Sequence, residues 1–314
     1  MKYLFGPVNS RRLGLSLGID LLISKTCNFN CIYCEIGAAS IFTCDRKEYT
    51  PTADVIAEID FLLDNQSTAT PIDIFTITGS GEPTLHSGLG KIIDHLKVKT
   101  DKKVAVLTNG SLLHLRDVRN DLSKADIVIP SLDSARKDSF QKINRPAGSI
   151  RLEKIIDGLV LFSSEFSGEF WLEILMVKGI NDTPEDVAAL QKALSRINPD
   201  KVQLHTVARP PLEDYAKPLS LQELEGIAAR FPGEVEIIAT FSQKKKGKAR
   251  KANISEILHI LQRRPCTAQD IRKALHLDRN STAEALEALA QSGSISKKVH
   301  QGKEYYQVTL HSKQ

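Results

Sequence analysis

The chain of 314 residues has few cysteines and no long hydrophobic run. Five cysteines are too few, and odd in number, for the disulfide framework of a small secreted protein. The longest apolar runs, such as residues 19–24, are far shorter than the roughly 20 residues that span a bilayer. The first residues also lack the apolar stretch of a signal peptide. We therefore expect a cytoplasmic protein that makes no contact with a membrane.

Neither sign of charge dominates the whole chain, which contains 42 Lys and Arg residues and 38 Asp and Glu residues. Hydrophobic residues make up 41% and charged residues 25%, which is typical of a soluble globular protein. The charge is unevenly distributed, because residues 242–314 carry 15 basic residues against 6 acidic ones. The rest of the chain carries 27 basic and 32 acidic residues. The basic character therefore belongs to the C-terminal segment.

Three of the five cysteines, Cys27, Cys31 and Cys34, lie within eight residues in the spacing C-x3-C-x2-C. Three thiolates in one loop can hold three irons of a cubane [4Fe–4S] cluster and leave the fourth iron without a protein ligand. A metal site with an open position binds or activates another molecule. A structural zinc site is the alternative, but it needs four ligands in paired spacing, and no C-x2-C or H-x3-H partner follows. The loop predicts an iron–sulfur cluster.

The run K-T-C-N-F-N-C-I-Y-C-E resembles the signature loop of the radical S-adenosylmethionine (SAM) superfamily. In that family the open iron binds the amino and carboxylate groups of SAM. The reduced cluster then cleaves SAM to methionine and a 5′-deoxyadenosyl radical, which abstracts hydrogen from a substrate. The family carries an aromatic residue near adenine before the third cysteine, and Tyr33 matches it. The resemblance implies two cofactors, a [4Fe–4S] cluster and SAM, and an external low-potential electron donor of the flavodoxin or ferredoxin type.

Four further segments match family motifs in order. T-G-S-G-E-P-T at 78–84 resembles the G-G-E-P motif, whose acidic residue accepts from the SAM amino group; here Ser80 replaces the second glycine. T-N-G at 108–110, S-L-D at 131–133 and V-K-G-I-N-D at 177–182 resemble strand-end motifs of the branch that contains the molybdenum-cofactor GTP cyclase. The resemblance implies that the SAM site is formed by Tyr33, Gly79, Ser80, Gly81, Glu82, Thr108, Asn109, Ser131, Asp133 and Val177.

The opening F-G-P-V-N-S-R-R-L-G is similar to that of wyosine-synthase-like iron–sulfur oxidoreductases. Both wyosine synthase and the cyclase rely on a second cluster. Cys44 and Cys266 are too few to hold one, which argues against those two reactions themselves. We expect both cysteines to be structural thiols, although Cys44 lies only ten residues past the cysteine loop.

Short β-rich runs alternate with amphipathic stretches over residues 1–240, which predicts a parallel sheet with helical crossovers. The predicted strands are Leu17–Ile23, Ile72–Thr78, Val104–Leu107, Ile127–Ser131, Phe170–Val177 and Val202–His205. The predicted helices are Ala53–Leu63, Gly88–Leu96, Leu112–Leu122, Ser134–Ile143, Leu152–Phe162, Pro184–Ile197 and Leu221–Phe231. The resemblance implies an α/β fold, a partial, open (β/α)6 barrel of the TIM type. The site motifs follow predicted strands, where such barrels hold their active sites.

A basic, glycine-containing linker at residues 242–252 is predicted to join the barrel, residues 1–241, to a small domain, residues 253–314. The domain has the pattern of three helices and a hairpin and resembles a winged helix-turn-helix. The predicted elements are Ile254–Leu261, a helix capped by Thr267, a helix from Ser281 to Gly293, and strands Ser294–Val299 and Glu304–Thr309. The third helix carries Glu284 and Glu287 and no basic residue, which is unfavourable against phosphates. The sequence does not distinguish between a nucleic acid and a protein as the partner of this domain.

Arginine binds carboxylate or phosphate in a bidentate manner. The candidates for contacts to anionic substrate groups are Arg11, Arg12, Arg145, His205 and Arg209. The sequence thus predicts a radical SAM enzyme that abstracts hydrogen from an anionic RNA, peptide or metabolite. The alternative is an iron–sulfur redox sensor that regulates transcription through the winged helix, but this would leave Glu82 and the strand-end motifs unexplained.

Overall fold

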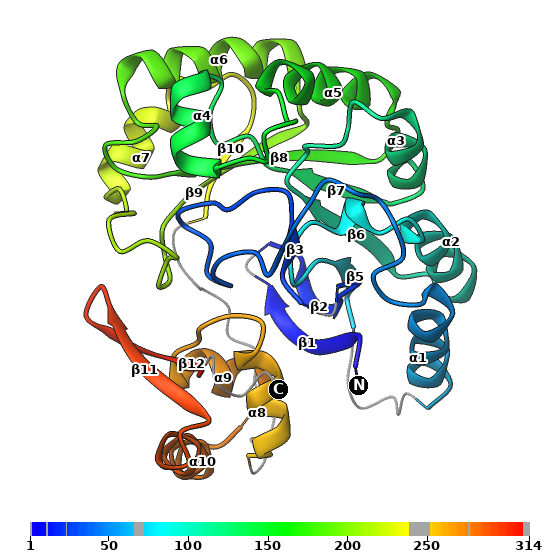
Figure 1. The fold of residues 1–314 in the computed structure, drawn as a ribbon, viewed down its shortest axis with the longest axis vertical. Coiled ribbons are helices and arrows are strands. Elements are labelled where there is room, and N and C mark those ends of the chain that lie inside the picture. The colour runs from blue at the N-terminus through cyan, green and yellow to red at the C-terminus, as the bar shows by residue number, and fades with distance from the viewer. Residues whose placement is uncertain are drawn as a thin grey trace.

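The computed structural model describes residues 2–10, 12–22, 24–65, 72–238, 252–275 and 277–309. Its main feature is an eight-stranded sheet in the order β1-β2-β5-β6-β7-β8-β9-β10 (Figure 1). The strands are β1 (Leu4–Ser10), β2 (Gly14–Ile19), β5 (Ile74–Ile77), β6 (Lys103–Thr108), β7 (Ile127–Pro130), β8 (Glu169–Met176), β9 (Lys201–Thr206) and β10 (Val235–Ile237). β1 runs antiparallel to β2, and all later neighbours are parallel. Within the described ranges β1 and β10 do not pair, so the barrel is open on one side.

All six predicted strands are present, with shifted ends. The first begins at Gly14 instead of Leu17, because its start pairs with β1. β1 itself was not predicted, since Gly6 and Pro7 interrupt its pattern and its register shifts between Phe5 and Val8. β10 was also not predicted, because it has only three residues, all of them half-buried.

Seven helices lie on the outer side of the sheet (Figure 1). They are α1 (Thr52–Asn65), α2 (Leu89–Lys99), α3 (Arg116–Leu122), α4 (Lys137–Asn144), α5 (Leu152–Glu165), α6 (Pro184–Ile197) and α7 (Leu221–Ala228). The start of α6 is as predicted, because Pro184 occupies its first turn and the Thr183 side chain accepts from Asp186 N. The predicted third helix starts later, at Arg116. These helices pack on fully buried strand residues such as Leu17, Ile77 and Val106.

The described C-terminal residues 252–309, here called the tail, contain three helices and a hairpin in the predicted order. The elements are α8 (Ile254–Leu261), α9 (Ala268–Leu275), α10 (Arg279–Gln291), β11 (Ile295–His300) and β12 (Lys303–Val308). Thr267 and Asp270 form the expected capping box, with two bonds of 3.1 Å. The third helix begins two residues before the predicted Ser281, because Asp278 caps it. The classification as a winged helix stays a prediction, and the linker lies outside the described residues except for Ala252.

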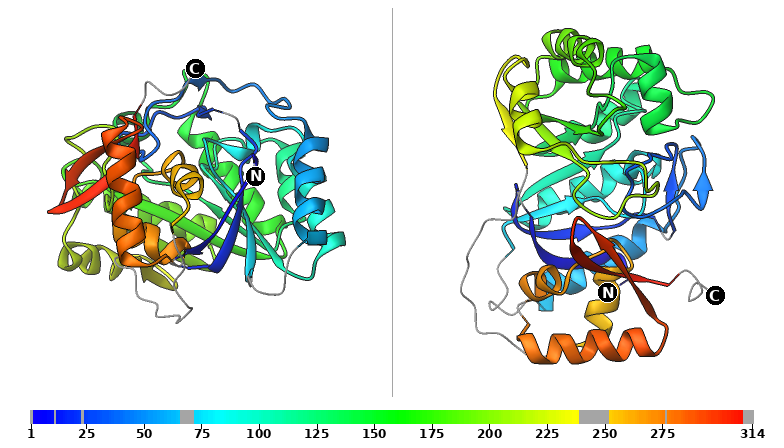
Figure 2. Two further views of the ribbon diagram at one scale, coloured as in Figure 1. Left: turned by 90° about the horizontal axis from the view of Figure 1, so that it is seen from below. Right: turned by 90° about the vertical axis from the view of Figure 1, so that its left-hand side faces the viewer.

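The tail lies on the open side of the barrel and contacts edge strand β1 and the segment that follows β9 (Figures 1 and 2). On one edge, Val8 of β1 packs against the apolar core of the tail. Across the opening, in the segment after β9, Ala208 O accepts from Tyr305 Oη at 3.0 Å and Val207 O accepts from Gln301 Nε2 at 2.8 Å. The tail therefore covers the gap between β1 and the end of β9.

No helix in the described ranges has both the length and the hydrophobicity needed to cross a membrane.

Candidate functional site

The three clustered cysteines lie in a loop that is fixed to the barrel by backbone bonds. Cys27 belongs to the short strand β3 (Thr26–Cys27), which pairs in parallel with β4 (Ile41–Phe42). Ile32 N donates to Ile143 O at 2.9 Å, at the end of α4. All three thiols are free and half-buried. The loop is therefore a fixed support that presents three sulfur atoms together.

Nitrogen donors lie close to each of these sulfur atoms. Lys25 Nζ lies 3.0 Å from Cys34 Sγ, Asn144 Nδ2 lies 3.5 Å from Cys31 Sγ, and Phe29 N lies 3.4 Å from Cys27 Sγ. Such donors stabilise a thiolate ligand and tune the metal that it holds.

Burial opposes ionisation of the free thiols. It raises the pKa of Cys27 to about 12, with a further contribution from the charge of Glu82, and it also raises the pKa of Cys31. Binding to iron would enforce the deprotonation that burial disfavours. No three His, Cys, Asp or Glu side chains in the described part of the chain are close enough to hold one metal ion. Three half-buried thiols on one loop are the donor set that a cubane cluster takes, with one thiolate for each of three irons.

The loop after β5 lies directly against the cysteine loop. Gly81 has a φ of +140°, and a Cβ atom there would overlap Thr26 O. Only glycine therefore allows this close approach. Thr26 N donates to Ser80 O at 2.9 Å, and Glu82 N donates to Thr26 O at 3.0 Å. These two bonds fix the Glu82 loop, residues 79–82, beside Cys27.

The Glu82 carboxylate is buried and hydrogen-bonded. Its Oε1 accepts from Thr84 N at 3.0 Å, Thr84 Oγ1 at 2.5 Å and Thr108 Oγ1 at 2.6 Å. Its Oε2 accepts from Asn109 N at 2.6 Å. Burial raises the pKa of Glu82, while these bonds act in the opposite direction. A carboxylate oxygen has two acceptor positions, so Oε2 can accept a further bond, as the predicted SAM contact requires.

A second group of predicted residues meets at the end of β7. Asp133 accepts from Tyr33 Oη at 2.5 Å, from Asn144 Nδ2 at 2.6 Å and from Leu175 N at 2.9 Å. Burial raises the pKa of Asp133 to about 6 and raises the pKa of Tyr33 well above its usual value. Tyr33 is therefore a neutral phenol held by a strand-end carboxyl group.

The structure brings the other predicted SAM residues to the same end of the sheet. Ser131 N donates to Thr108 O at 3.0 Å, which joins the ends of β7 and β6. Val177 is buried with Ile32 under the cysteine loop, and Tyr33 packs against the same apolar group. The predicted contacts of these residues with SAM stay predictions.

A cavity of about 360 Å³ lies inside the barrel, with Cys34 on its wall. Its charged lining residues are Arg12, Glu35, Glu173, Arg209, Arg263 and Arg264. His205 also lines it, so three of the predicted substrate residues meet here. Arg12 pairs with Glu173 and donates to Gln203 Oε1 at 2.7 Å, and Arg209 pairs with Glu35 at 3.0 Å.

Two predicted substrate residues are not part of this cavity as described. Arg145 pairs with Glu213 at 2.6 Å and lines a separate pocket with Asn30 and Phe42. Arg11 lies outside the described residues.

Several residues of the site were not predicted. The sequence does carry a signal for Glu173, because it is a charged residue on the half-buried side in the middle of strand β8, where only the first residue, Glu169, is also charged. Arg263 and Arg264 come from the tail and line the cavity. Nothing local in the sequence indicates that they reach a cavity formed by the barrel.

The comparisons with known proteins agree with this geometry. The family model described as "Radical SAM superfamily" matches residues 21–191 of this chain. The chain is 38% identical, over 98% of its length, to a protein named GTPase Obg from Brachyspira hyodysenteriae, but spans only 45% of that protein. It is 32% identical over its whole length to a UPF0026 protein of Methanocaldococcus jannaschii and covers 98% of it. A GTP 3′,8-cyclase of Lactiplantibacillus plantarum is 31% identical over 52% of this chain and 47% of its own length.

Among solved structures, TYW1 with a lysine–pyruvate adduct bound has the same fold over 72% of this chain and 74% of that one. The TM-score is 0.52 at 19% identity. An α/β fold with a partial TIM-like barrel is thereby confirmed. The superfamily binds a [4Fe–4S] cluster and SAM, which confirms the two predicted cofactors. The cysteine loop, the strand order and these similarities together show that the chain belongs to the radical SAM superfamily and, within it, to the UPF0026 proteins.

Proposed function

We propose that the protein is an enzyme that abstracts hydrogen from an anionic RNA, peptide or metabolite bound in the barrel cavity. When bound, the reduced cluster and SAM supply the 5′-deoxyadenosyl radical that serves as the abstracting group. One observation carries the proposal: the cysteine loop, the Glu82 loop and an arginine-lined cavity lie together inside one barrel.

The residues have distinct roles in this proposal. Cys27, Cys31 and Cys34 hold the cluster, and Glu82 Oε2 accepts from the ammonium group of SAM. Asp133 keeps Tyr33 in place beside the cysteine loop. An external low-potential donor of the flavodoxin or ferredoxin type reduces the cluster, because enzymes of this superfamily generally need one.

The charge of the cavity supports an anionic substrate. Four arginines line it, and three of them pair with a carboxylate, Glu173, Glu35 or Asp20, which leaves an excess of one positive charge. Glu173 holds Arg12 and Glu35 holds Arg209, so the guanidinium groups are fixed before a ligand arrives. Fixed guanidinium groups bind carboxylate or phosphate with little loss of side-chain entropy.

We further propose that residues 253–314 form a winged-helix domain that contacts nucleic acid or protein, joined to the barrel by residues 242–252. The surface of α10 carries Glu284 and Glu287, and α10 lies on the side of the tail turned away from the sheet (Figure 2). An alternative function as a redox-sensing transcription regulator leaves the arginine-lined cavity without a role.

The test is SAM cleavage by anaerobically reconstituted protein. With a reductant and SAM, the wild type should hold about four irons per chain and form 5′-deoxyadenosine. The triple variant Cys27→Ala, Cys31→Ala, Cys34→Ala should form none. A fully loaded wild-type protein that leaves SAM intact would overturn the proposal.

A further inference from the structure

We infer that the tail takes part in SAM binding through Arg263, a positioning residue that fixes the Glu82 loop by way of Asp20. The inference rests on the proposed function, because it takes SAM to be the ligand of that loop. It assigns to the C-terminal segment a role inside the barrel in addition to any contact with a partner.

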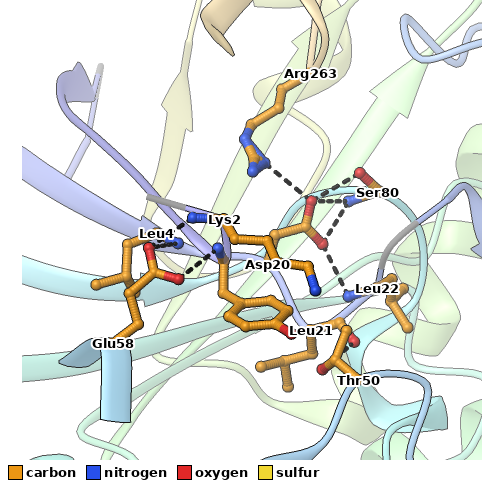
Figure 3. Close-up of polar contacts among 10 residues, drawn as sticks. Lys2, Leu4, Asp20, Leu21, Leu22, Thr50, Glu58, Ser80 and Arg263 are labelled. Carbon is orange, nitrogen blue, oxygen red and sulfur yellow. Dashed lines mark hydrogen bonds and ion pairs between the residues drawn. The ribbon is translucent and has the colours of Figure 1, made fainter. Parts of the chain in front are cut away.

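Asp20 is the centre of a buried network that holds the Glu82 loop (Figure 3). It follows β2 directly and is 4% exposed. Its Oδ2 accepts from Ser80 Oγ at 2.7 Å and from Arg263 Nη1 at 3.1 Å. Ser80 N lies 3.1 Å from each carboxylate oxygen, and Leu22 N donates to Oδ1 at 3.1 Å. Both the side chain and the backbone of Ser80 therefore depend on one carboxylate.

In the Glu82 loop, Gly79 as well as Ser80 lies against the Asp20 carboxylate. Gly79 has a φ of +142°, and a Cβ atom there would overlap the carboxyl carbon of Asp20. Two residues beyond Ser80, Glu82 presents the carboxylate proposed to bind SAM. A displacement of Asp20 would therefore shift the start of a four-residue loop whose end contacts the cofactor.

Arg263 reaches Asp20 from the tail, directly after α8. Its guanidinium carbon lies 4.3 Å from the centre of the Phe5 ring, and its side chain is only 13% exposed. The side chain thus lies against the Phe5 ring of β1 and ends on the Asp20 carboxylate (Figure 3). Ion pair, ring contact and burial together define one fixed position for it.

The charge of Arg263 is needed because Asp20 is buried. Desolvation raises the pKa of Asp20, and the Arg263 charge acts against this rise. Removing one member of a buried ion pair leaves the other without compensation, and the structure then relaxes or the carboxyl group takes up a proton. Either change alters the acceptor that fixes Ser80.

The experiment measures SAM affinity of the full-length, cluster-loaded protein, by calorimetry and by the change that SAM causes in the electron paramagnetic resonance signal of the reduced cluster. Arg263→Met keeps the apolar stem and removes the charge. We expect its Kd for SAM to rise about tenfold, the usual scale for loss of a charge-assisted bond, while iron content stays at the wild-type level. Arg263→Lys should recover part of the loss.

The matched control is Lys298→Met. Lys298 forms another ion pair between tail and barrel, with Asp214 at 2.9 Å, but does not contact the Asp20 network. Its removal should leave the Kd for SAM unchanged. Equal losses in both variants would show that docking of the tail in general matters, and would overturn the specific role of Arg263.

A double-mutant cycle separates positioning from a general loss of stability. Asp20→Asn should also weaken SAM binding, and the double variant Asp20→Asn, Arg263→Met should lose less than the two single effects combined. Additive effects, or an unchanged Kd in Arg263→Met, would overturn the inference. A wild-type protein that carries the full cluster but does not bind SAM would instead overturn the proposed function.

Discussion

The cofactor edge, formed by the strand ends around Glu82, and the cavity inside the same barrel are built from different kinds of contact. At the cofactor edge, Glu82 bonds to Thr84, Thr108 and Asn109, and each of these belongs to a short motif that follows a strand. In the cavity, the partners Arg12–Glu173 and Arg209–Glu35 lie 161 and 174 residues apart in the sequence. The contacts of Glu82, the proposed SAM ligand, therefore come from short motifs, whereas the cavity proposed for the substrate depends on contacts between distant segments.

The largest expected effect lies in the cysteine loop. Cys27→Ala, Cys31→Ala or Cys34→Ala should each abolish the cluster, because the chain supplies only three thiolates to it. Iron and sulfide content after anaerobic reconstitution measures this. Cys44→Ser is the matched control, since Cys44 lies near Ser149, with 3.4 Å between the sulfur and the hydroxyl oxygen. Loss of the cluster in the control, or its retention in all three alanine variants, would contradict the ligand assignment.

A smaller effect is expected inside the cavity, where the side chains of Arg12 and Glu173 are 11% and 24% exposed. Glu173→Gln leaves the Arg12 charge poorly compensated and should lower the free energy of unfolding by about 2 kcal/mol, less than for a fully buried pair. Denaturant unfolding measures this change. The double variant with Arg12→Met should regain part of the stability, and equal stability of wild type and Glu173→Gln would show that the pair is not a structural contact.

At the cofactor edge, Glu82→Gln should preserve packing but remove the charge that receives the SAM ammonium group. SAM affinity should fall at least about tenfold with the cluster intact. The control is Glu169→Gln, because the Glu169 carboxylate pairs with Lys103 at 2.6 Å where β8 and β6 begin, at the opposite ends of the strands from the motifs. If both variants bind SAM like the wild type, Glu82 has no role in its binding.

The smallest effect is expected at the surface pair of Lys298 and Asp214. Its side chains are 35% and 83% exposed, so solvent screens the interaction. Asp214→Asn should leave the denaturant midpoint of unfolding close to the wild-type value. A larger change would mean that docking of the tail depends on this pair more than on Val8 and Arg263.

The elements that carry regular patterns could be predicted from the sequence. α6 begins at Pro184 and ends at Ile197 as expected, because a capping threonine and a proline mark its start. The third tail helix was predicted to begin at Ser281, since the cap at Asp278 precedes the apolar pattern. β1 could not be predicted, because its pairing with β2, and not its own composition, makes it a strand.

Contacts between residues far apart in the sequence also limit what can be predicted of the site. The positions of Glu82 and Asp133 at strand ends could be predicted, because each lies in a motif that follows a strand, and their roles in SAM binding stay predictions. Arg263 could not, because its partner Asp20 lies 243 residues away and only the folded chain brings them together. Sequence reading was also unable to distinguish Arg12, which lines the cavity, from Arg145, which lies in another pocket.

The central claim is that the protein removes hydrogen from a substrate in its cavity, and isotope transfer tests it most directly. Reduced, cluster-loaded protein is incubated with SAM and with RNA, peptide or small-molecule fractions from cells grown in deuterated medium, and the mass of 5′-deoxyadenosine is measured. We predict deuterium in this product with one of the fractions, and loss of the transfer in Arg12→Met. Continued cleavage of SAM without deuterium transfer from any fraction would contradict the claim.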